Sequence, residues 1–329
     1  GYWEFQLGLG AVWGIALVFI ITTPIQIHYL LRRMLTGVIS ITICLVMGSL
    51  LLQSQALSED TVASTRDFYG LLSVKEKYAQ EPENHQYVLT HGITTHGYQF
   101  LLPEKRTLPT AYYVEDSGVG IGFLHHPVRP GRLKVGVIGL GVGVLATYGQ
   151  AGDEFRFYEI NPTVADVAQG EYFSYLRDTS ARVEIILGDG RLSLERELAA
   201  SGSQDFDLLV VDAFNSDSIP THLLTQEAFQ LYLQHLDPEG ILALHISSQY
   251  LNLRPVVWGL ADSLALEGRM FYHKPEDIRS KPSLWILLTT SQAFLNDPEV
   301  LEQSVEREAG IPGLRIWRDD YSNLFQILK

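Results

Sequence analysis

Residues 137–146, "VIGLGVGVLA", decide the fold class, because an apolar strand runs here directly into three glycines. Gly139, Gly141 and Gly143 are spaced two residues apart. Glycine lets the backbone turn sharply and approach a ligand closely, and the N-terminus of the helix that follows faces that ligand. The stretch therefore predicts a nucleotide-binding turn, and the rest of the chain has to identify the nucleotide.

Apolar strands alternate with helical stretches from residue 133 onward. This alternation is typical of an α/β fold with a parallel, doubly wound sheet and helices on both faces. Ligands of such sheets bind at the carboxyl ends of the strands. The predicted strands are residues 134–139, 155–160, 183–187, 208–212, 241–246, 270–272 and 284–289, and the predicted helices are residues 164–169, 192–200, 226–236 and 255–267.

After the glycine turn, the next three predicted strands also end in residues that suit a nucleoside. The second strand ends in Glu159, and an acid there typically accepts hydrogen bonds from the ribose hydroxyls. The third leads into Asp189 and Gly190, where a carboxylate can accept a hydrogen bond from an exocyclic amine. The fourth ends in Asp212. Packing and helix capping explain each feature alone, but their joint placement favours nucleoside binding.

The spacing of the glycines separates two kinds of nucleoside ligand. Gly-x-Gly-x-Gly followed by Val144 departs from the Gly-x-Gly-x-x-Gly form, whose third glycine serves a dinucleotide pyrophosphate. Asp189 and Asp212 have no standard part in nicotinamide binding. The pattern therefore favours an S-adenosyl ligand.

Two apolar stretches without charged residues, 7–27 and 35–52, precede these strands. Each is long enough to cross a hydrocarbon core of about 30 Å. We expect an N-terminal transmembrane helical hairpin, in which Pro24 kinks or ends the first helix; buried helices of a soluble core are the alternative. Because the chain starts at Gly1 without a methionine, we expect further helices upstream.

The predicted hairpin makes the chain an integral protein of a bacterial-type inner membrane, with the lipid bilayer as a partner. A domain that uses a nucleoside cofactor is expected in the cytoplasm. Arg32 and Arg33 lie in the connecting turn, however, and the positive-inside tendency would place that turn, not the large domain, in the cytoplasm. The sequence leaves this conflict open.

Residues 66–127 carry short β-branched and aromatic runs with glycine and proline between them. Such runs predict a small β-strand domain ahead of the large one. We therefore divide the chain into two transmembrane helices (1–56), a linker (57–65), a small β domain (66–130) and a Rossmann-like, S-adenosyl-binding domain (131–329).

Charge and cysteine content exclude several classes of function. The chain carries 24 basic and 38 acidic residues, a net charge of −14. A nucleic-acid backbone requires a basic surface, so no nucleic acid is expected as a partner. Cys44 is the one cysteine, which excludes an internal disulfide and a cysteine-based zinc site. The histidines lack metal-ligand spacing, so we predict no metal.

Seven stretches carry a resemblance to a known family. They are "YYVEDSGVGIGFLHHP" (112–127), "VIGLGVG" (137–143), "FYEINP" (157–162), "LLVVDAFNSDSIPTHLLTQEAF" (208–229), "RDFYGLLSVKE" (66–76), "HGITTHGYQF" (91–100) and "DDYSNLF" (319–325). The chain resembles spermidine synthase and related polyamine aminopropyltransferases, and the last three stretches look most like the membrane-fused branch of that family. The resemblance covers residue 66 to the C-terminus and implies the seven-stranded, class I methyltransferase type of Rossmann-like sheet.

The resemblance also implies a donor, an acceptor and a role for each site residue. The donor is S-adenosylmethionine or decarboxylated S-adenosylmethionine, and the acceptor is a small amine. Asp212 takes a proton from the attacking amine or orients it, together with Tyr113. The residues implied in cofactor binding are Gly139, Gly141, Gly143, Glu159, Asp189, Gly190 and Gln99, and those implied in substrate binding are Asn215, Asp217 and Tyr112.

Two positions depart from the family pattern. Val142 stands where the family has an acid that engages the amino end of the decarboxylated cofactor, and Asn215 stands at the second acid of the catalytic loop. Asp217 lies two residues later and is a possible substitute. Two alternatives to aminopropyl transfer therefore stay open: a catalytically silent scaffold subunit of a membrane complex, and another S-adenosylmethionine-dependent reaction such as methyl transfer or a lyase step. From the family we expect a homodimer.

Overall fold

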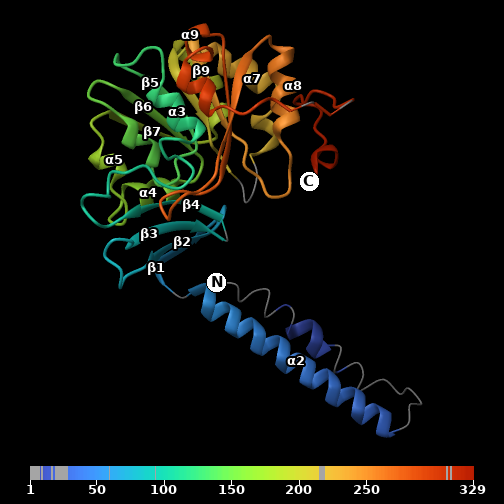
Figure 1. The fold of residues 1–329 in the computed structure, drawn as a ribbon. Coiled ribbons are helices and arrows are strands. Elements are labelled where there is room, and N and C mark those ends of the chain that lie inside the picture. The colour runs from blue at the N-terminus through green and yellow to red at the C-terminus, as the bar shows by residue number, and fades with distance from the viewer. Residues whose placement is uncertain are drawn as a thin grey trace. The chain divides into compact units, whose positions relative to one another are not determined.

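The computed structural model describes residues 8, 10–15, 18, 29–58, 60–92, 94–214, 219–308, 310–311 and 313–329. The chain divides into two compact units, Gly1–Thr61 and Val62–Lys329. Figure 1 shows the ribbon.

The first unit contains the long helix α2 (Tyr29–Ser58). None of the helices within the described residues combines the length and the apolar character that crossing a bilayer requires. This finding contradicts the predicted transmembrane hairpin and the predicted integral-membrane localisation. Most of the predicted first span, residues 7–27, lies outside the described residues.

The second unit begins with a small four-stranded sheet in the order β1-β2-β3-β4. Strands β2 and β3 pair antiparallel, and so do β3 and β4, with a register shift between Leu89 and Thr90. Figure 1 shows these strands side by side in blue to teal. Their bounds are Thr61–Asp67 (β1), Gly70–Lys77 (β2), Gln86–His91 (β3) and Thr94–Phe100 (β4).

The large sheet has seven strands in the order β10-β11-β9-β8-β5-β6-β7. The α/β, Rossmann-like fold of the methyltransferase type is therefore confirmed. The strand bounds are Lys134–Ile138 (β5), Glu154–Glu159 (β6), Arg182–Leu187 (β7), Phe206–Val211 (β8), Leu236–His245 (β9), Glu267–His273 (β10) and Ser283–Thr289 (β11).

The sheet is mixed, not purely parallel as predicted. Strand β11 runs antiparallel to both of its neighbours, β9 and β10, whereas β5 to β9 pair in parallel. Residues 274–282, which join β10 to β11, contain no helix. A parallel return needs a crossover of about a dozen residues or more, usually through a helix. The short connection therefore forces β11 to reverse direction.

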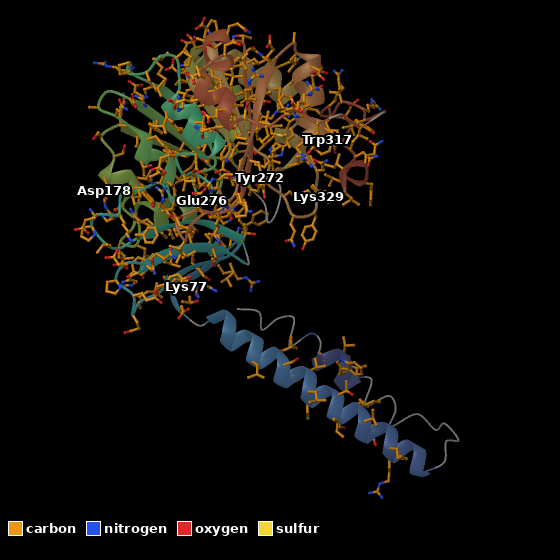
Figure 2. The ribbon with its side chains drawn as sticks, in the orientation of Figure 1. Lys77, Asp178, Tyr272, Glu276, Trp317 and Lys329 are labelled. Carbon is orange, nitrogen blue, oxygen red and sulfur yellow. The ribbon has the colours of Figure 1, made fainter. Side chains whose placement is uncertain are left out.

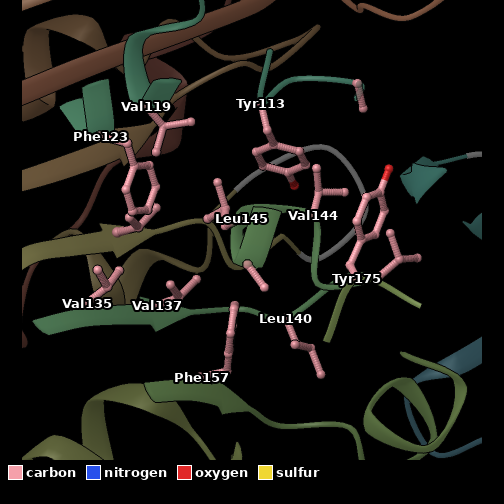
Figure 3. Close-up of a cluster of buried hydrophobic side chains, with 14 of the residues drawn as sticks. Tyr113, Val119, Phe123, Val135, Val137, Leu140, Val144, Leu145, Phe157 and Tyr175 are labelled. Atoms are coloured by element: carbon pink, nitrogen blue, oxygen red, sulfur yellow. The ribbon is translucent and has the colours of Figure 1, made fainter. Parts of the chain in front are cut away.

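Helices cover both faces of this sheet. Along β8, Leu208 and Val210 belong to one core cluster, and Leu209 and Val211 belong to the other. Because successive side chains of a strand point to opposite faces, each face of the sheet has its own apolar core. Figure 3 shows part of the first core, in which Val135, Val137 and Phe157 of the strands pack near residues of α3 and the glycine loop.

The helices of the second unit are short. Helix α3 packs against β8, β9, β10 and β11. The helices of this unit have the bounds Gly118–Leu124 (α3), Val144–Tyr148 (η1, a 3-10 helix), Pro162–Gln169 (α4), Tyr175–Asp178 (α5), Gly190–Ser201 (α6), Thr221–Leu223 (η2, 3-10), Gln226–His235 (α7), Arg254–Ser263 (α8), Gln292–Leu295 (α9), Pro298–Gln303 (α10) and Leu324–Ile327 (η3, 3-10).

A buried carboxylate stabilises the start of the large sheet. Asp153 is 1% exposed and accepts hydrogen bonds from Arg129 (2.7 Å) and from the backbone N–H groups of Leu133 and Gln150. Burial alone would raise the pKa of Asp153, but the hydrogen bonds from Arg129, Gln150 and Leu133 outweigh it and lower that pKa. The ionised carboxylate therefore stabilises the folded state.

We expect Asp153→Asn to destabilise the fold by about 3 kcal/mol, because it leaves the guanidinium of Arg129 without its counter-charge. The contribution of Asp153 is fully present above the ordinary pKa of an aspartate and is lost as pH falls through the lowered folded pKa. Urea unfolding of both proteins across acidic pH measures it, and the difference should shrink as pH falls. Asp166→Asn, at an exposed position on α4, is the control; an equal effect of both variants contradicts the prediction.

Candidate functional site

A cavity of about 480 Å³ opens at the carboxyl ends of β8 and β9. It lies between the glycine loop, strand β4 of the small sheet and the segment that leads into β11. Its wall contains His96 and Gly141, the carboxylate of Asp212, and His245 at the end of β9. The other lining residues are Thr94, Thr95, Tyr112, Tyr113, Phe214, Ser247, Ser248, Gln249, Tyr272, Lys281, Pro282, Ser283, Leu284 and Lys329. Tyr272 and Lys329 are labelled in Figure 2.

The glycine loop fits tightly between two other parts of the backbone. Gly139 and Gly141 have φ of +101° and +55°, which favour glycine. A Cβ at Gly139 would lie 2.4 Å from the carbonyl oxygen of Asp212, and one at Gly141 would lie 2.6 Å from that of His96. The loop therefore holds the end of β8 and strand β4 close together, and with them the residues that line the cavity.

The helix that follows the glycine loop is the five-residue 3-10 helix η1. Gly143 takes the last position before η1 with φ of +81°, and a Cβ there would clash with Leu176 of α5. Gly143 is therefore needed for packing.

Asp212 lies directly after β8, and both of its carboxylate oxygens are held. The hydroxyl of Tyr113 donates to Oδ2 at 2.6 Å, and Nδ1 of His245 lies 2.6 Å from Oδ1. Burial, followed by the charge of Asp212, raises the pKa of Tyr113 well above its ordinary value, so the phenol stays protonated and donates. The carboxylate is thereby fixed in one orientation at the cavity wall.

Ser247 extends this network beyond His245. Its Oγ lies 2.9 Å from Nε2 of His245 and accepts the backbone N–H of Leu284 at 2.8 Å. Since the serine oxygen already accepts a hydrogen bond, its own O–H is available to donate to Nε2. The network then assigns the ring proton of His245 to Nδ1, which donates to Asp212.

Aromatic rings enclose His245 on several sides. The indole of Trp285 stacks on the imidazole with ring centroids 4.4 Å apart and planes 9° apart. The rings of Tyr112 and Phe214 lie at 5.2 Å and 4.9 Å. The imidazole is 3% exposed and cannot rotate without displacing these rings. These rings therefore fix the position of the imidazole, whose Nδ1 donates a hydrogen bond to Asp212.

Glu159 ends β6 beside the glycine loop and is 8% exposed. Its two oxygens accept the backbone N–H groups of Leu140 (3.0 Å) and Asn161 (2.8 Å). Each carboxylate oxygen has a second lone pair, so the group retains capacity for two ribose hydroxyls. Burial raises the pKa of Glu159, although the N–H bonds from Asn161 and Leu140 oppose the shift.

We expect Glu159→Gln to weaken binding of an S-adenosyl ligand by about tenfold to a hundredfold, because it removes a charged hydrogen-bond acceptor. Since the pKa of Glu159 is raised, affinity should also fall as pH is lowered from neutrality, and the glutamine variant should lose this dependence. Calorimetric titration with methylthioadenosine across pH tests both statements. Glu154→Gln, at the exposed opposite end of β6, is the matched control; equal affinities of the two variants contradict the assignment.

Asp189 and Gly190 stand between the end of β7 and helix α6. Asp189 caps α6 by accepting the N–H of Leu192 at 3.0 Å, and its other oxygen lies 2.9 Å from Nε2 of His222. The hydrogen bond with His222 lowers the pKa of Asp189, so the carboxylate is ionised at neutral pH. Gly190 packs against Ile138 with no room for a Cβ. Both residues thus have structural roles, and their contact with adenine stays a prediction.

The predicted residues divide into those at the cavity and those away from it. Tyr112, Tyr113, Gly141 and Asp212 line it. Gln99 is buried and bonds through its amide to Ser174 and to the carbonyl of Arg106, away from the described lining. Asn215 and Asp217 lie outside the described residues. No group of three metal-binding side chains occurs in the part of the chain that the structure describes.

Val142, where the family has an acid, is buried completely. A Cβ added to Gly97 of β4 would lie 2.6 Å from a methyl carbon of Val142. The isopropyl group thus fills the space beside Gly97 and joins the apolar core.

His245 is the functional candidate that the sequence prediction missed. It follows "ILAL" at the end of the fifth predicted strand, and the carboxyl ends of neighbouring parallel strands meet at one sheet edge. Extending the comparison of strand ends by one strand would have placed it beside Asp212.

Comparison with known proteins bears on this site. No family model matches the chain. A polyamine aminopropyltransferase from Vibrio vulnificus is 33% identical over 132 residues, which are 39% of this chain and 41% of the relative. A probable polyamine aminopropyl transferase from Bifidobacterium longum is 24% identical over 196 residues, 60% of this chain and 35% of the relative. The chain thus spans less than half the length of these two curated relatives.

Solved structures show the same fold. Spermidine synthase from Thermotoga maritima matches with a TM-score of 0.52 at 14% identity, over 79% of this chain and 82% of that one. A probable spermidine synthase from Corynebacterium glutamicum matches with a TM-score of 0.50 at 13% identity, over 70% and 83%. The predicted resemblance to polyamine aminopropyltransferases is therefore confirmed, whereas the assignment to a membrane-fused branch has no support.

Proposed function

From the similarity to polyamine aminopropyltransferases, we propose that this chain is a transferase that joins an amine acceptor to a carbon of a decarboxylated S-adenosylmethionine donor. The observation that carries the proposal is the carboxylate of Asp212. It lies in a cavity at the end of β8, and hydrogen bonds from Tyr113 and His245 hold both of its oxygens. The class of reaction is taken from the names of the relatives. The fixed carboxylate of Asp212 is the group that such a reaction needs to receive the amine.

The residues at the strand ends suit the donor. Gly141 brings the backbone to the cavity, and Glu159 keeps lone pairs for ribose hydroxyls. Asp189 offers an ionised carboxylate for the adenine amine. The donor supplies a sulfonium carbon that an uncharged amine can attack.

The chain's own residues would prepare the amine. An ammonium group has no lone pair and must lose a proton before it attacks. A fixed carboxylate can orient the amine by accepting one of its N–H bonds and can take the proton that the product sheds. Asp212 fills this role, while Tyr113 and His245 prevent its carboxylate from rotating. The rings of Tyr112 and Phe214 offer aromatic faces to a cationic acceptor.

The proposal is tested by incubating the protein with decarboxylated S-adenosylmethionine and a panel of amines, with mass spectrometry of the products. An amine that gains an aminopropyl group, with release of methylthioadenosine, is the expected result. Absence of turnover together with absence of calorimetric binding of the donor and methylthioadenosine would overturn it.

The buried Val142 favours S-adenosylmethionine as an alternative donor. Without an acid at this position, the amino end of the decarboxylated donor loses its charged partner in the glycine loop. We therefore include S-adenosylmethionine itself in the same panel. A product that gains a methyl group would assign another S-adenosyl reaction to the same cavity.

A further inference from the structure

The cavity's charged side chains do not suit a polycation. Among the described lining residues, Asp212 is the one carboxylate, and Lys281 and Lys329 contribute two amino groups. A buried ammonium group requires a paired charge or several hydrogen-bond acceptors. A diamine held by Asp212 at one end would meet lysines, not a second acid, elsewhere in the described wall.

The carboxylate of Asp212 is already partly used. Tyr113 and His245 occupy one lone pair on each oxygen at 2.6 Å. Each oxygen keeps a second lone pair, so the carboxylate can still accept a hydrogen bond from an amine.

The two lysines come from different segments of the chain. Lys281 precedes β11 and is held in place by its backbone N–H, which donates to the carbonyl of Ala111 at 2.9 Å. Lys281 lines the cavity. The amino group of Lys329 donates to the carbonyl of Ser248, itself a lining residue. An anionic group in the cavity would gain a charge-assisted partner from either one.

His96 supplies an uncharged polar group at the same wall. Its Nε2 is buried and has no hydrogen-bond partner within the described structure. Burial and the nearby His91 lower the pKa of His96 to about 4, so the imidazole is neutral at physiological pH. Because this ring is uncharged, it adds nothing to the balance of charged groups in the cavity.

We infer that the acceptor is an amine that also carries a carboxylate, an amino-acid-like molecule, and not a diamine. This inference rests on the proposed function of the same cavity. Asp212 receives the amine, and Lys281 and Lys329 receive the carboxylate. We choose an amino-acid-like acceptor over a diamine because the described wall contains two lysine amino groups and one side-chain carboxylate.

Acceptors of matched chain length test the inference. γ-Aminobutyrate, putrescine and n-butylamine present a carboxylate, an ammonium and a methyl group at the far end. Each is assayed with both S-adenosyl donors, and binding of each is measured by calorimetry with methylthioadenosine present. We expect γ-aminobutyrate to exceed putrescine by about tenfold or more in kcat/KM and in affinity. Lys281→Glu should reduce that ratio by about tenfold, whereas Lys274→Glu, on the same connection but outside the cavity, should leave it unchanged.

The outcomes separate the two proposals. Turnover of putrescine in preference to γ-aminobutyrate overturns the inference and leaves the transferase standing. Preferred binding of γ-aminobutyrate without any transfer overturns the transferase and leaves the ligand class standing. No binding of either acceptor, in a protein whose thermal unfolding is normal, overturns the inference as well.

Discussion

Asp212→Asn is expected to lower the rate of transfer by about 10²- to 10⁴-fold, the range that a positioned base contributes. An amide has nearly the shape of the carboxylate but cannot take the proton of the attacking amine. Tyr113 would still donate to the amide oxygen, and the amide nitrogen can donate to Nδ1 of His245 once the ring proton moves to Nε2, so the cavity wall should keep its form. Steady-state kinetics with a saturating donor, together with product analysis, measures the loss.

Binding provides the control for this variant. Since Glu159 and the glycine loop lie on other strand ends, affinity for methylthioadenosine should stay within about twofold of the unmodified protein, well below the tenfold that 1.4 kcal/mol produces. A normal rate in Asp212→Asn would remove Asp212 from the chemistry. A collapse of thermal stability would instead identify the residue as structural.

His245→Leu is expected to lower kcat by about a hundredfold with little change in KM, because it frees the carboxylate of Asp212 to rotate. It also leaves a buried oxygen without its donor, which costs about 1–3 kcal/mol of folding free energy.

His245→Asn separates positioning from packing. The asparagine amide reaches the place of Nδ1 and can still donate to Asp212, but it loses the bond with Ser247 and the stacking on Trp285. We expect it to recover most of the rate. If both variants lose kcat equally, His245 serves the core only and its assigned role at the site is wrong.

The sequence predicted the large sheet well because each of its strands is an apolar run bounded by turns. The runs at 134–139 and 208–212 differ by at most two residues at either end from β5 and β8. The direction of each strand was not predicted as well as its position, because a strand's own residues do not encode which way its neighbour runs. The reversal of β11 follows from the absence of a helix in residues 274–282. The predicted elements already placed no helix between the strands at 270–272 and 284–289.

The candidate site was predictable only in part. Strand ends identified Asp212 and Glu159, since position on the sheet depends on local pattern. The bond between Tyr113 and Asp212 joins residues far apart in the chain; the resemblance to a family named both residues but not the bond between them. The partners of Gln99 and the burial of Val142 depend on how the small sheet packs against the glycine loop, which no local pattern encodes.

Because Val142 and Gly97 are in contact, a change at either position affects the packing of the other. An acid placed at 142 alone would put an unpaired charge into an apolar core, and a larger residue at 97 alone would collide with the valine. An acid at position 142 would therefore need a polar or cationic partner beside β4, which the apolar core around Val142 does not offer. Any engineering of the donor preference should therefore vary the two residues as a pair.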